Sequence, residues 1–229
     1  MHASREDYQA FHRYRRDALL DLVGRHLTAK AARALDVGGG GDVSGHAQAL
    51  LERHCGELHS LDQGGDVEAG QRRGVQSTAC DVDREAFPFP GNHFGLTIFA
   101  SVIEHLYNPH HVLDEIARVL APGGLLILEA PNAVSLGRRL DALAGRNPFR
   151  WFNQYNALER KAPMEYCSVF YTAEEAAALL DGRFTILETR YAMHNPPANP
   201  LKQGLRRAVA AIRPRLSDCF FIAAARADD

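Results

Sequence analysis

Four consecutive glycines, Gly38 to Gly41, follow directly on the apolar segment 34–37, and a segment with the apolar spacing of a helix comes next. Glycine has no Cβ, so its backbone N–H groups can approach a ligand closely and its φ can be positive. A strand that enters a helix through such a turn is typical of nucleotide-binding sheets. The run therefore predicts a ligand-binding turn, with a tight turn that binds nothing as the alternative.

Apolar segments and helical patterns alternate along the rest of the chain. We expect strands at 34–37, 58–62, 75–80, 96–100, 125–130, 184–191 and 220–225. We expect helices at 5–30, 43–54 and 201–212, with Gly56 ending the second of these. A further helix should run from the Asn108 cap to a stop at Pro122-Gly123-Gly124, and another from the Thr172 capping box to Leu180. Such alternation predicts an α/β fold with a doubly wound parallel sheet.

The chain is expected to divide into a helical cap at 1–30 and a main domain at 31–229. The main domain carries an insertion at about 133–171, which we place over the carboxyl edge of the sheet, where such sheets bind ligands. A carboxyl-terminal elaboration at about 195–216 has a basic stripe beside an apolar helix face. A solvated helix face explains that stripe, and an anionic acceptor site or a peripheral membrane contact is the alternative.

The composition of the chain narrows the function classes. Its formal net charge of −2 argues against general binding of nucleic acid, which usually needs a basic excess. We find no signal-peptide core and no apolar run long enough to span a bilayer. The four cysteines are scattered without a C-x-x-C pair, so we expect reduced thiols, a cytoplasmic protein and no metal site.

Asp62 ends the second expected strand, about twenty residues beyond the glycine turn. An open α/β sheet places an acceptor for ribose hydroxyls at this point. The alternative is an ordinary turn aspartate before Gly64 and Gly65. The spacing favours the ribose-binding interpretation.

Several strings, in this order, resemble those of the class I S-adenosylmethionine-dependent methyltransferases over residues 31–190. They are Leu35-Asp36-Val37-Gly38-Gly39-Gly40, Leu61-Asp62, Cys80-Asp81-Val82, Phe87-Pro88-Phe89, Ser101-Val102-Ile103-Glu104-His105-Leu106 and Glu115 through Gly124. The resemblance implies a Rossmann-like, mostly parallel sheet of seven strands with the last strand antiparallel and helices on both faces. It also implies S-adenosyl-L-methionine as the cofactor and S-adenosyl-L-homocysteine as the product.

The resemblance assigns roles to residues at the carboxyl ends of the strands. Asp62 would bind the ribose diol, Asp81 and the Val82 N–H would bind the adenine, and the glycines would lie beside the methionine portion, with Asp36 orienting their loop or approaching the ligand's amine. The complete set of expected cofactor-binding residues is Asp36, Gly38, Gly39, Gly40, Asp62, Gln63, Asp81, Val82 and Ser101. No Walker lysine follows the glycines, and this cofactor carries no phosphate that would need one.

An oxygen acceptor would need a base, and His105 is the first candidate because a neutral imidazole works near its own pKa. Glu104 is the second candidate. For both, capping and packing at a strand-to-helix junction is the alternative. Lid candidates are Tyr8, His12, Tyr14 and Tyr155, which can equally be packing residues.

The resemblance implies methyl transfer to an oxygen or nitrogen of a small molecule. The strings Glu129-Ala130-Pro131-Asn132 and Val169-Phe170-Tyr171-Thr172 are similar to those of members that modify sugars, glycans or other secondary metabolites. Asp42 and Gly95 depart from the family pattern, which usually has a glycine and an aspartate there. These departures leave open a binding module with weak or no catalysis. A nicotinamide oxidoreductase and a nucleic-acid methyltransferase fit the motifs less well. We expect a monomer or a homodimer.

Overall fold

The computed structural model describes residues 5–39, 45–63, 71, 74–149, 169–193 and 200–227, with the side chains of 5–12, 200, 202 and 203 left out. The description therefore omits Gly40, Asp42 and Tyr155, as well as the side chains of Tyr8 and His12. The expectations for these five residues lie outside the described part of the chain.

A seven-stranded sheet forms the centre of the molecule, in the order β3-β2-β1-β4-β5-β7-β6. Its strands are β1 (Ala31–Val37), β2 (Cys55–Asp62), β3 (Gln76–Ala79), β4 (Phe94–Ala100), β5 (Leu120–Pro131), β6 (Phe184–Ala192) and β7 (Cys219–Arg226). Neighbouring strands from β3 to β5 are parallel, and β7 runs antiparallel to both β5 and β6. The predicted fold class is confirmed, including the antiparallel last strand.

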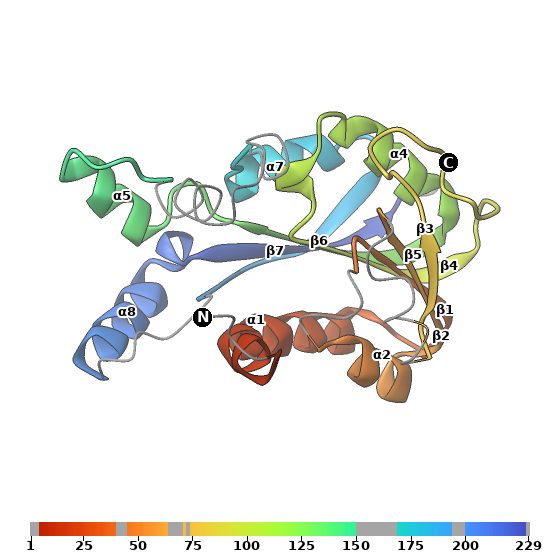
Figure 1. Ribbon diagram of the computed structural model, residues 1–229, viewed down its shortest axis with the longest axis horizontal. Helices are drawn as coiled ribbons and strands as arrows, with labels where there is room; N and C mark the ends of the chain where they lie inside the picture. The colour runs from red at the N-terminus through yellow and green to blue at the C-terminus, as the bar shows by residue number, and fades with distance from the viewer. Residues whose placement is uncertain are drawn as a thin grey trace.

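Helices cover both faces of this sheet (Figure 1). The helices are α1 (Arg5–His26), α2 (Ala47–Arg53), α4 (Pro109–Val119), α5 (Leu136–Leu143), α7 (Ala173–Leu180) and α8 (Pro200–Ile212), with short 3₁₀ turns η1 (Ile103–His105) and η3 (Pro214–Leu216). Along β5, Leu126 and Leu128 pack with α4 and α7, whereas Leu125 and Ile127 pack with α1 and α2. Alternate residues of one strand thus belong to two separate apolar cores, which fixes the register of the sheet.

Two predicted helix starts are confirmed by their hydrogen bonds. The Asn108 side chain accepts a hydrogen bond from the His111 N–H at 3.3 Å, and Pro109 opens α4. Thr172 and Glu175 form a reciprocal capping box at the start of α7. Both caps satisfy backbone donors that the first helical turn leaves without partners.

Other boundaries differ from the prediction. The first helix ends at His26, before Lys30, and α2 ends at Arg53. Gly56 does not end that helix but lies within β2, where a Cβ would come 2.9 Å from the Ala32 carbonyl oxygen of β1. Glycine is needed at this position because two strands approach closely. Gly56 therefore indicates a contact between strands and not the end of a helix.

The connection after α4 also differs from the prediction. Pro122-Gly123-Gly124 lies inside β5, which starts immediately after the helix at Leu120. Phe94 pairs with Leu120 and Leu96 pairs with Leu125, so the extra residues of this β4–β5 irregularity lie in β5 at 121–124, opposite Gly95, where the family usually has aspartate. This extra stretch contains Gly123 and Gly124. A glycine is typical of such an irregularity, because it adds no side chain that must be packed.

Candidate functional site

A cavity of about 420 Å³ opens at the carboxyl ends of β1, β2 and β4. It lies where the strand order reverses between β1 and β4, which is the point at which open α/β sheets bind ligands. Its lining comes from the end of β2 and from the segments that follow four strands: Gly38, Leu61, Asp62, Gln63, Cys80, Asp81, Val82, Asp83, Arg84, Ser101, Val102, His105, Leu106 and Tyr107.

Seven residues singled out from the sequence meet in this cavity. They are Gly38, Asp62, Gln63, Asp81, Val82, Ser101 and His105. Asp36, Gly39 and Glu104 do not line it. Tyr14 does not line it either, and its hydroxyl accepts a hydrogen bond from Arg207 Nη2 of α8 at 3.1 Å.

Steric constraints explain the first two glycines of the run. Gly38 has a φ of +73°, and a Cβ there would lie 2.3 Å from Val102 Cγ2. A Cβ at Gly39 would lie 2.6 Å from Asp36 Oδ2 and 2.7 Å from Ser60 Oγ. The chain therefore needs glycine at both positions, and the turn after β1 packs tightly against its surroundings.

Asp36 lies beneath this turn, away from the cavity. It is buried, and His46 Nε2 donates to its Oδ2 at 2.7 Å. His46 immediately precedes α2, so the pair connects the end of β1 with the start of the helix that follows the glycines. Of the two expectations for Asp36, this position suits a residue that orients the loop. The sequence contained no signal for the histidine partner.

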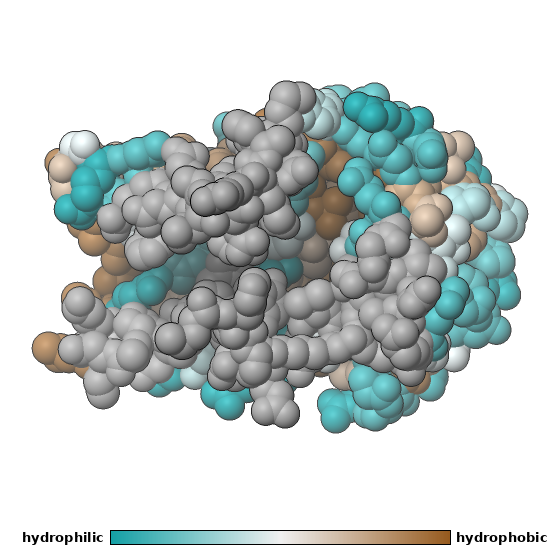
Figure 2. Space-filling view, viewed as in Figure 1, coloured by the Kyte–Doolittle hydropathy of each residue, from teal (hydrophilic) through white to brown (hydrophobic). Residues whose placement is uncertain are grey.

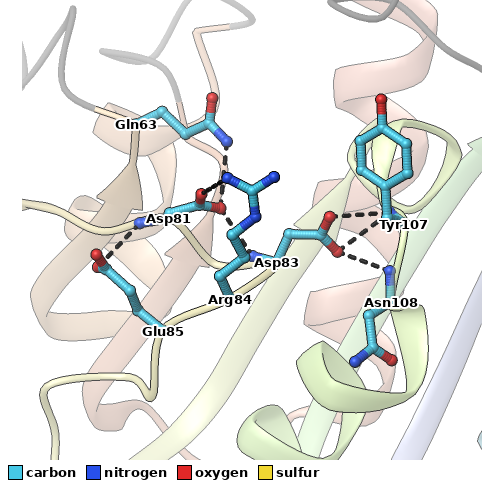
Figure 3. Close-up of polar contacts among 7 residues, drawn as sticks. All are labelled: Gln63, Asp81, Asp83, Arg84, Glu85, Tyr107 and Asn108. Atoms are coloured by element: carbon cyan, nitrogen blue, oxygen red, sulfur yellow. Dashed lines mark hydrogen bonds and ion pairs between the residues drawn. The ribbon is translucent and has the colours of Figure 1, made fainter.

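A group of acidic side chains forms one side of the cavity (Figure 3). The Gln63 amide donates to Asp81 Oδ1 at 3.4 Å, and Asp81 also accepts from the Asp83 N–H at 3.2 Å. The Arg84 guanidinium lies 3.6 Å from Asp81 Oδ2 with its side chain largely exposed. The cavity is consequently rich in hydrogen-bond acceptors. Among the described lining residues, Arg84 carries the positive charge.

Asp83 was not expected from the sequence. Its carboxylate accepts hydrogen bonds from the Tyr107 N–H at 2.9 Å and the Asn108 N–H at 2.8 Å (Figure 3). It thereby holds the start of α4 against the segment after β3. Tyr107 lines the cavity with an exposed ring. Two sequence features could have pointed to these residues: the acids at both 81 and 83, and the aromatic residue directly before the Asn108 cap.

Ser101 follows β4 with a φ of +56°, a conformation that non-glycine residues rarely adopt. Its backbone N–H and its hydroxyl both donate to Glu129 of β5, the hydroxyl to Oε2 at 3.0 Å. Arg15 of α1 forms an ion pair with the same carboxylate oxygen at 2.9 Å. Glu129 thus connects the cavity, the sheet and the first helix. Its hydrogen bonds to Ser101 stabilise the strained backbone conformation of that residue.

Glu104 and His105 occupy η1, but only His105 reaches the cavity. Glu104 is buried, and burial together with the nearby Glu129 charge raises its pKa to about 8. Its Oε2 atom has no hydrogen-bond partner in the described part of the structure. The His105 side chain keeps 36% of its surface exposed, and partial burial lowers its pKa below 6.5. At neutral pH the carboxyl therefore holds a proton and the imidazole does not.

Cys80 also lines the cavity. Burial and the Glu85 charge raise the pKa of its thiol to about 11, so the thiol stays protonated and is a poor nucleophile. Cys55 and Cys219 are free and buried. Within the described residues, no group of three or more histidine, cysteine, aspartate or glutamate side chains is placed to hold a metal ion. No helix in that part of the chain is both long and apolar enough to cross a bilayer.

Comparison of the sequence with known proteins identifies a methyltransferase domain and several related methyltransferases. Residues 35–128 match the model of a methyltransferase domain family. The chain is 25% identical over 170 residues to a ubiquinone biosynthesis O-methyltransferase of Sinorhizobium fredii, covering 66% of this chain and 65% of the relative. It is 32% identical over 133 residues to the ubiquinone/menaquinone biosynthesis C-methyltransferase UbiE of Azotobacter vinelandii, covering 56% and 49%. The chain thus spans about half to two thirds of the length of these two curated relatives.

A solved structure extends the likeness to nearly the whole chain. The N-methyltransferase NodS of Bradyrhizobium japonicum WM9, in complex with S-adenosyl-L-homocysteine, is 17% identical and has a TM-score of 0.60. The alignment covers 95% of this chain and 88% of that chain. At this identity the likeness establishes a shared fold.

Proposed function

We propose that this chain, which by its domain and its fold is a class I S-adenosylmethionine-dependent methyltransferase, transfers the cofactor's methyl group to an oxygen or nitrogen of a small molecule. One observation carries the proposal: the cavity at the switch point of the sheet brings together Gly38, Asp62, Asp81 and His105. The names of two matched relatives, an O-methyltransferase and a C-methyltransferase of quinone biosynthesis, support a small-molecule acceptor.

The donors and acceptors of the cavity suit this cofactor. Its ribose diol and its adenine amine are hydrogen-bond donors, and Asp62 and Asp81 supply carboxylate acceptors, which form the stronger charge-assisted bonds. A carboxylate at Asp62 would equally hold the ribose of a dinucleotide, whose pyrophosphate would lie at the glycine turn. The choice of S-adenosyl-L-methionine over a nicotinamide dinucleotide therefore rests on the match to a methyltransferase domain.

The protein's residues have distinct roles in this proposal. Asp62, with Gln63 beside it, holds the ribose, whereas Asp81 and the Val82 N–H hold the adenine. Gly38, Gly39 and Gly40 receive the methionine portion, and Ser101 is a further residue that contacts the cofactor. When bound, the cofactor supplies a methyl group on a sulfonium, so the leaving group is already activated. Catalysis then depends mainly on aligning the acceptor with that methyl group.

His105 is the proposed base for a hydroxyl acceptor. Its imidazole lines the cavity and is neutral at pH 7, so it can take the proton that the hydroxyl loses. Glu104 is less suited, because it is buried away from the cavity with a pKa of about 8. The helical cap at 1–30 and the insertion at about 133–171 are proposed to enclose the acceptor. Tyr14 is a lid candidate, as are Tyr8, His12 and Tyr155, whose side chains lie outside the described part of the chain.

Calorimetric titration with S-adenosyl-L-homocysteine tests the cofactor site first. We expect micromolar binding by the wild type and at least tenfold weaker binding by Asp62→Ala and by Asp81→Ala, since each loses a charge-assisted hydrogen bond worth about 1.5–3 kcal/mol. Asp181→Ala is the matched control, because Asp181 is exposed at the end of α7. Binding that Asp62→Ala and Asp81→Ala leave unchanged would contradict the site. A titration with NADH should give no heat of binding.

Turnover is tested separately with radiolabelled cofactor and a panel of phenols, sugars and amines. Methyl transfer to one class that His105→Gln slows at least tenfold supports the complete proposal. Tight binding of the cofactor without transfer to any acceptor would instead favour a binding module. Asp42 and Gly95, where the chain departs from the family pattern, are the residues that keep this second function under consideration.

A further inference from the structure

The apolar side of α8 faces away from the protein. Leu201, Leu205 and Ile212 are spaced by four and seven residues, so they share one side of the helix. All three are exposed, and Leu201 keeps 84% of its surface accessible. An amphipathic helix of a globular domain normally buries this side against the core.

Two arginines of α8 contact distant parts of the chain. Arg206 forms an ion pair with Asp218, which directly precedes β7. Arg207 donates to the Tyr14 hydroxyl of α1 at 3.1 Å. The helix is thus attached partly through charged residues, together with Val209 and Ala210, and its leucines are exposed.

A second helix has the same inverted orientation. In α5, Leu140 and Leu143 are exposed, the latter to 85%, whereas Asp141 is buried and pairs with Arg146. The Arg138 guanidinium lies against the rings of Phe149 and Phe170, 4.9 and 4.2 Å from their centroids. Here too charged groups turn inward and leucines turn outward.

The two helices lie at the same end of the molecule. Leu136 of α5 and Val209 of α8 line one small cavity. Figure 1 shows α5 and α8 projecting from the same end of the sheet, and Figure 2 shows hydrophobic surface at that end. We name the set Leu140, Leu143, Leu201, Leu205 and Ile212 the leucine end.

Exposed basic residues adjoin the leucine end, whereas Arg206 and Arg215 pair with Asp218 and Glu174. Residues 200–216 contain five arginines and lysines and no acidic residue, in a chain whose net charge is −2. Arg139 beside Leu140 and Arg213 beside Ile212 are exposed. Apolar side chains with a cationic border match the interface of an anionic bilayer, where the former enter the acyl boundary and the latter meet phosphate.

We propose that the leucine end docks on the surface of an anionic phospholipid membrane. Charge argues against a second copy as the occupant, because two such ends would bring their arginines together. The inference does not depend on methyl transfer, since attachment to lipid can be measured without cofactor or acceptor.

Flotation with vesicles tests the proposal on the full chain. We expect binding to vesicles of phosphatidylcholine mixed with phosphatidylglycerol and much weaker binding to phosphatidylcholine alone. The variant Leu201→Gln/Leu205→Gln/Ile212→Gln should lower partitioning at least about tenfold, because it removes most of the inserted apolar surface. Arg139→Gln/Arg213→Gln should lower binding to the mixed vesicles and reduce its sensitivity to salt.

A matched control is Ile186→Gln/Leu187→Gln, which alters exposed aliphatic residues on β6. Each variant should fold, because the altered side chains are exposed. Circular dichroism checks this for every variant. Failure of the folded wild type to float with mixed vesicles would overturn the proposal, as would equal flotation of the triple variant. A dimer that the triple variant dissociates, without vesicle binding by the wild type, would assign the leucine end to a second copy instead.

Discussion

Arg15 and Glu129 form an ion pair of 2.9 Å that connects the first helix to strand β5, with Glu129 fully buried. The same carboxylate accepts the Ser101 hydroxyl, so one residue links α1 to the edge of the cavity. Removing one partner of a buried pair leaves an uncompensated charge, which is costlier than removing both.

Arg15→Met should lower the free energy of unfolding by about 3 kcal/mol or more. Adding Glu129→Gln should recover part of that loss, because the buried charge is then gone. Urea unfolding of the two single variants and the double variant measures the coupling. Arg25→Met in the same helix, whose side chain is half exposed, should cost less than 1 kcal/mol. Equal losses for Arg15→Met and Arg25→Met would refute the buried linkage.

Gly38→Ala should weaken both the fold and the cofactor site, because the new methyl group would strike Val102 and φ is positive. Gly182→Ala is a matched control: Gly182 has a φ of +76° but nothing within 4 Å of the Cβ position. The control should cost about 1–2 kcal/mol of stability through φ alone and leave binding of S-adenosyl-L-homocysteine unchanged. Gly38→Ala should in addition weaken binding at least tenfold by calorimetry. Equal affinity in the two variants would contradict a role of the turn in binding.

The pH dependence of turnover should report His105. Burial lowers the pKa of this imidazole below 6.5, and a base is active only when unprotonated. We therefore expect kcat/KM for a hydroxyl acceptor to rise with pH below 6.5 and then to level off. His105→Gln should remove this acid limb along with most of the rate, whereas His110→Gln, which alters an exposed residue of α4, should keep it. An acid limb that persists in His105→Gln would assign the base elsewhere.

Glu104 should make the protein less stable as pH rises. Its pKa is about 8 in the folded state against 4.5 as the ordinary value, so folding favours the protonated form. The stabilisation is complete below pH 4.5 and is lost as pH rises through 8. Each pKa unit corresponds to about 1.4 kcal/mol. Glu104→Gln, which cannot ionise, should therefore gain several kcal/mol relative to wild type between pH 5 and pH 8 in urea unfolding. The exposed Glu52→Gln should show no such gain, and a pH-independent difference for Glu104→Gln would refute the shifted pKa.

Much of the architecture follows from local signals. Asn108 and Thr172 cap helices through bonds to residues three positions away, so their roles are visible in the sequence. Asp62, Asp81 and His105 follow separate strands, and parallel strands bring their carboxyl ends to one edge. Their meeting in one cavity could therefore be predicted without knowing any distance.

Contacts between distant segments could not be predicted in this way. The sequence does not indicate that Asp36 pairs with His46, or that Glu129 pairs with Arg15. The sequence placed His105 ahead of Glu104 as the candidate base, but it did not show how differently the two side chains are surrounded. Their difference arises because one side chain turns into the core and the other toward the cavity, which tertiary packing decides.

The position of β7 between β5 and β6 has a consequence for synthesis of the chain. A ribosome releases the strands around the cavity, β1, β2 and β4, well before residues 219–226, so that part of the sheet can assemble early. Strand β6, in contrast, has no partner until β7 emerges and inserts beside it. Its exposed Ile186 and Leu187 then lie on an unpaired edge, where a nascent chain is most open to aggregation and to capture by chaperones. Insertion of residues 219–226 is thus the step that closes the sheet.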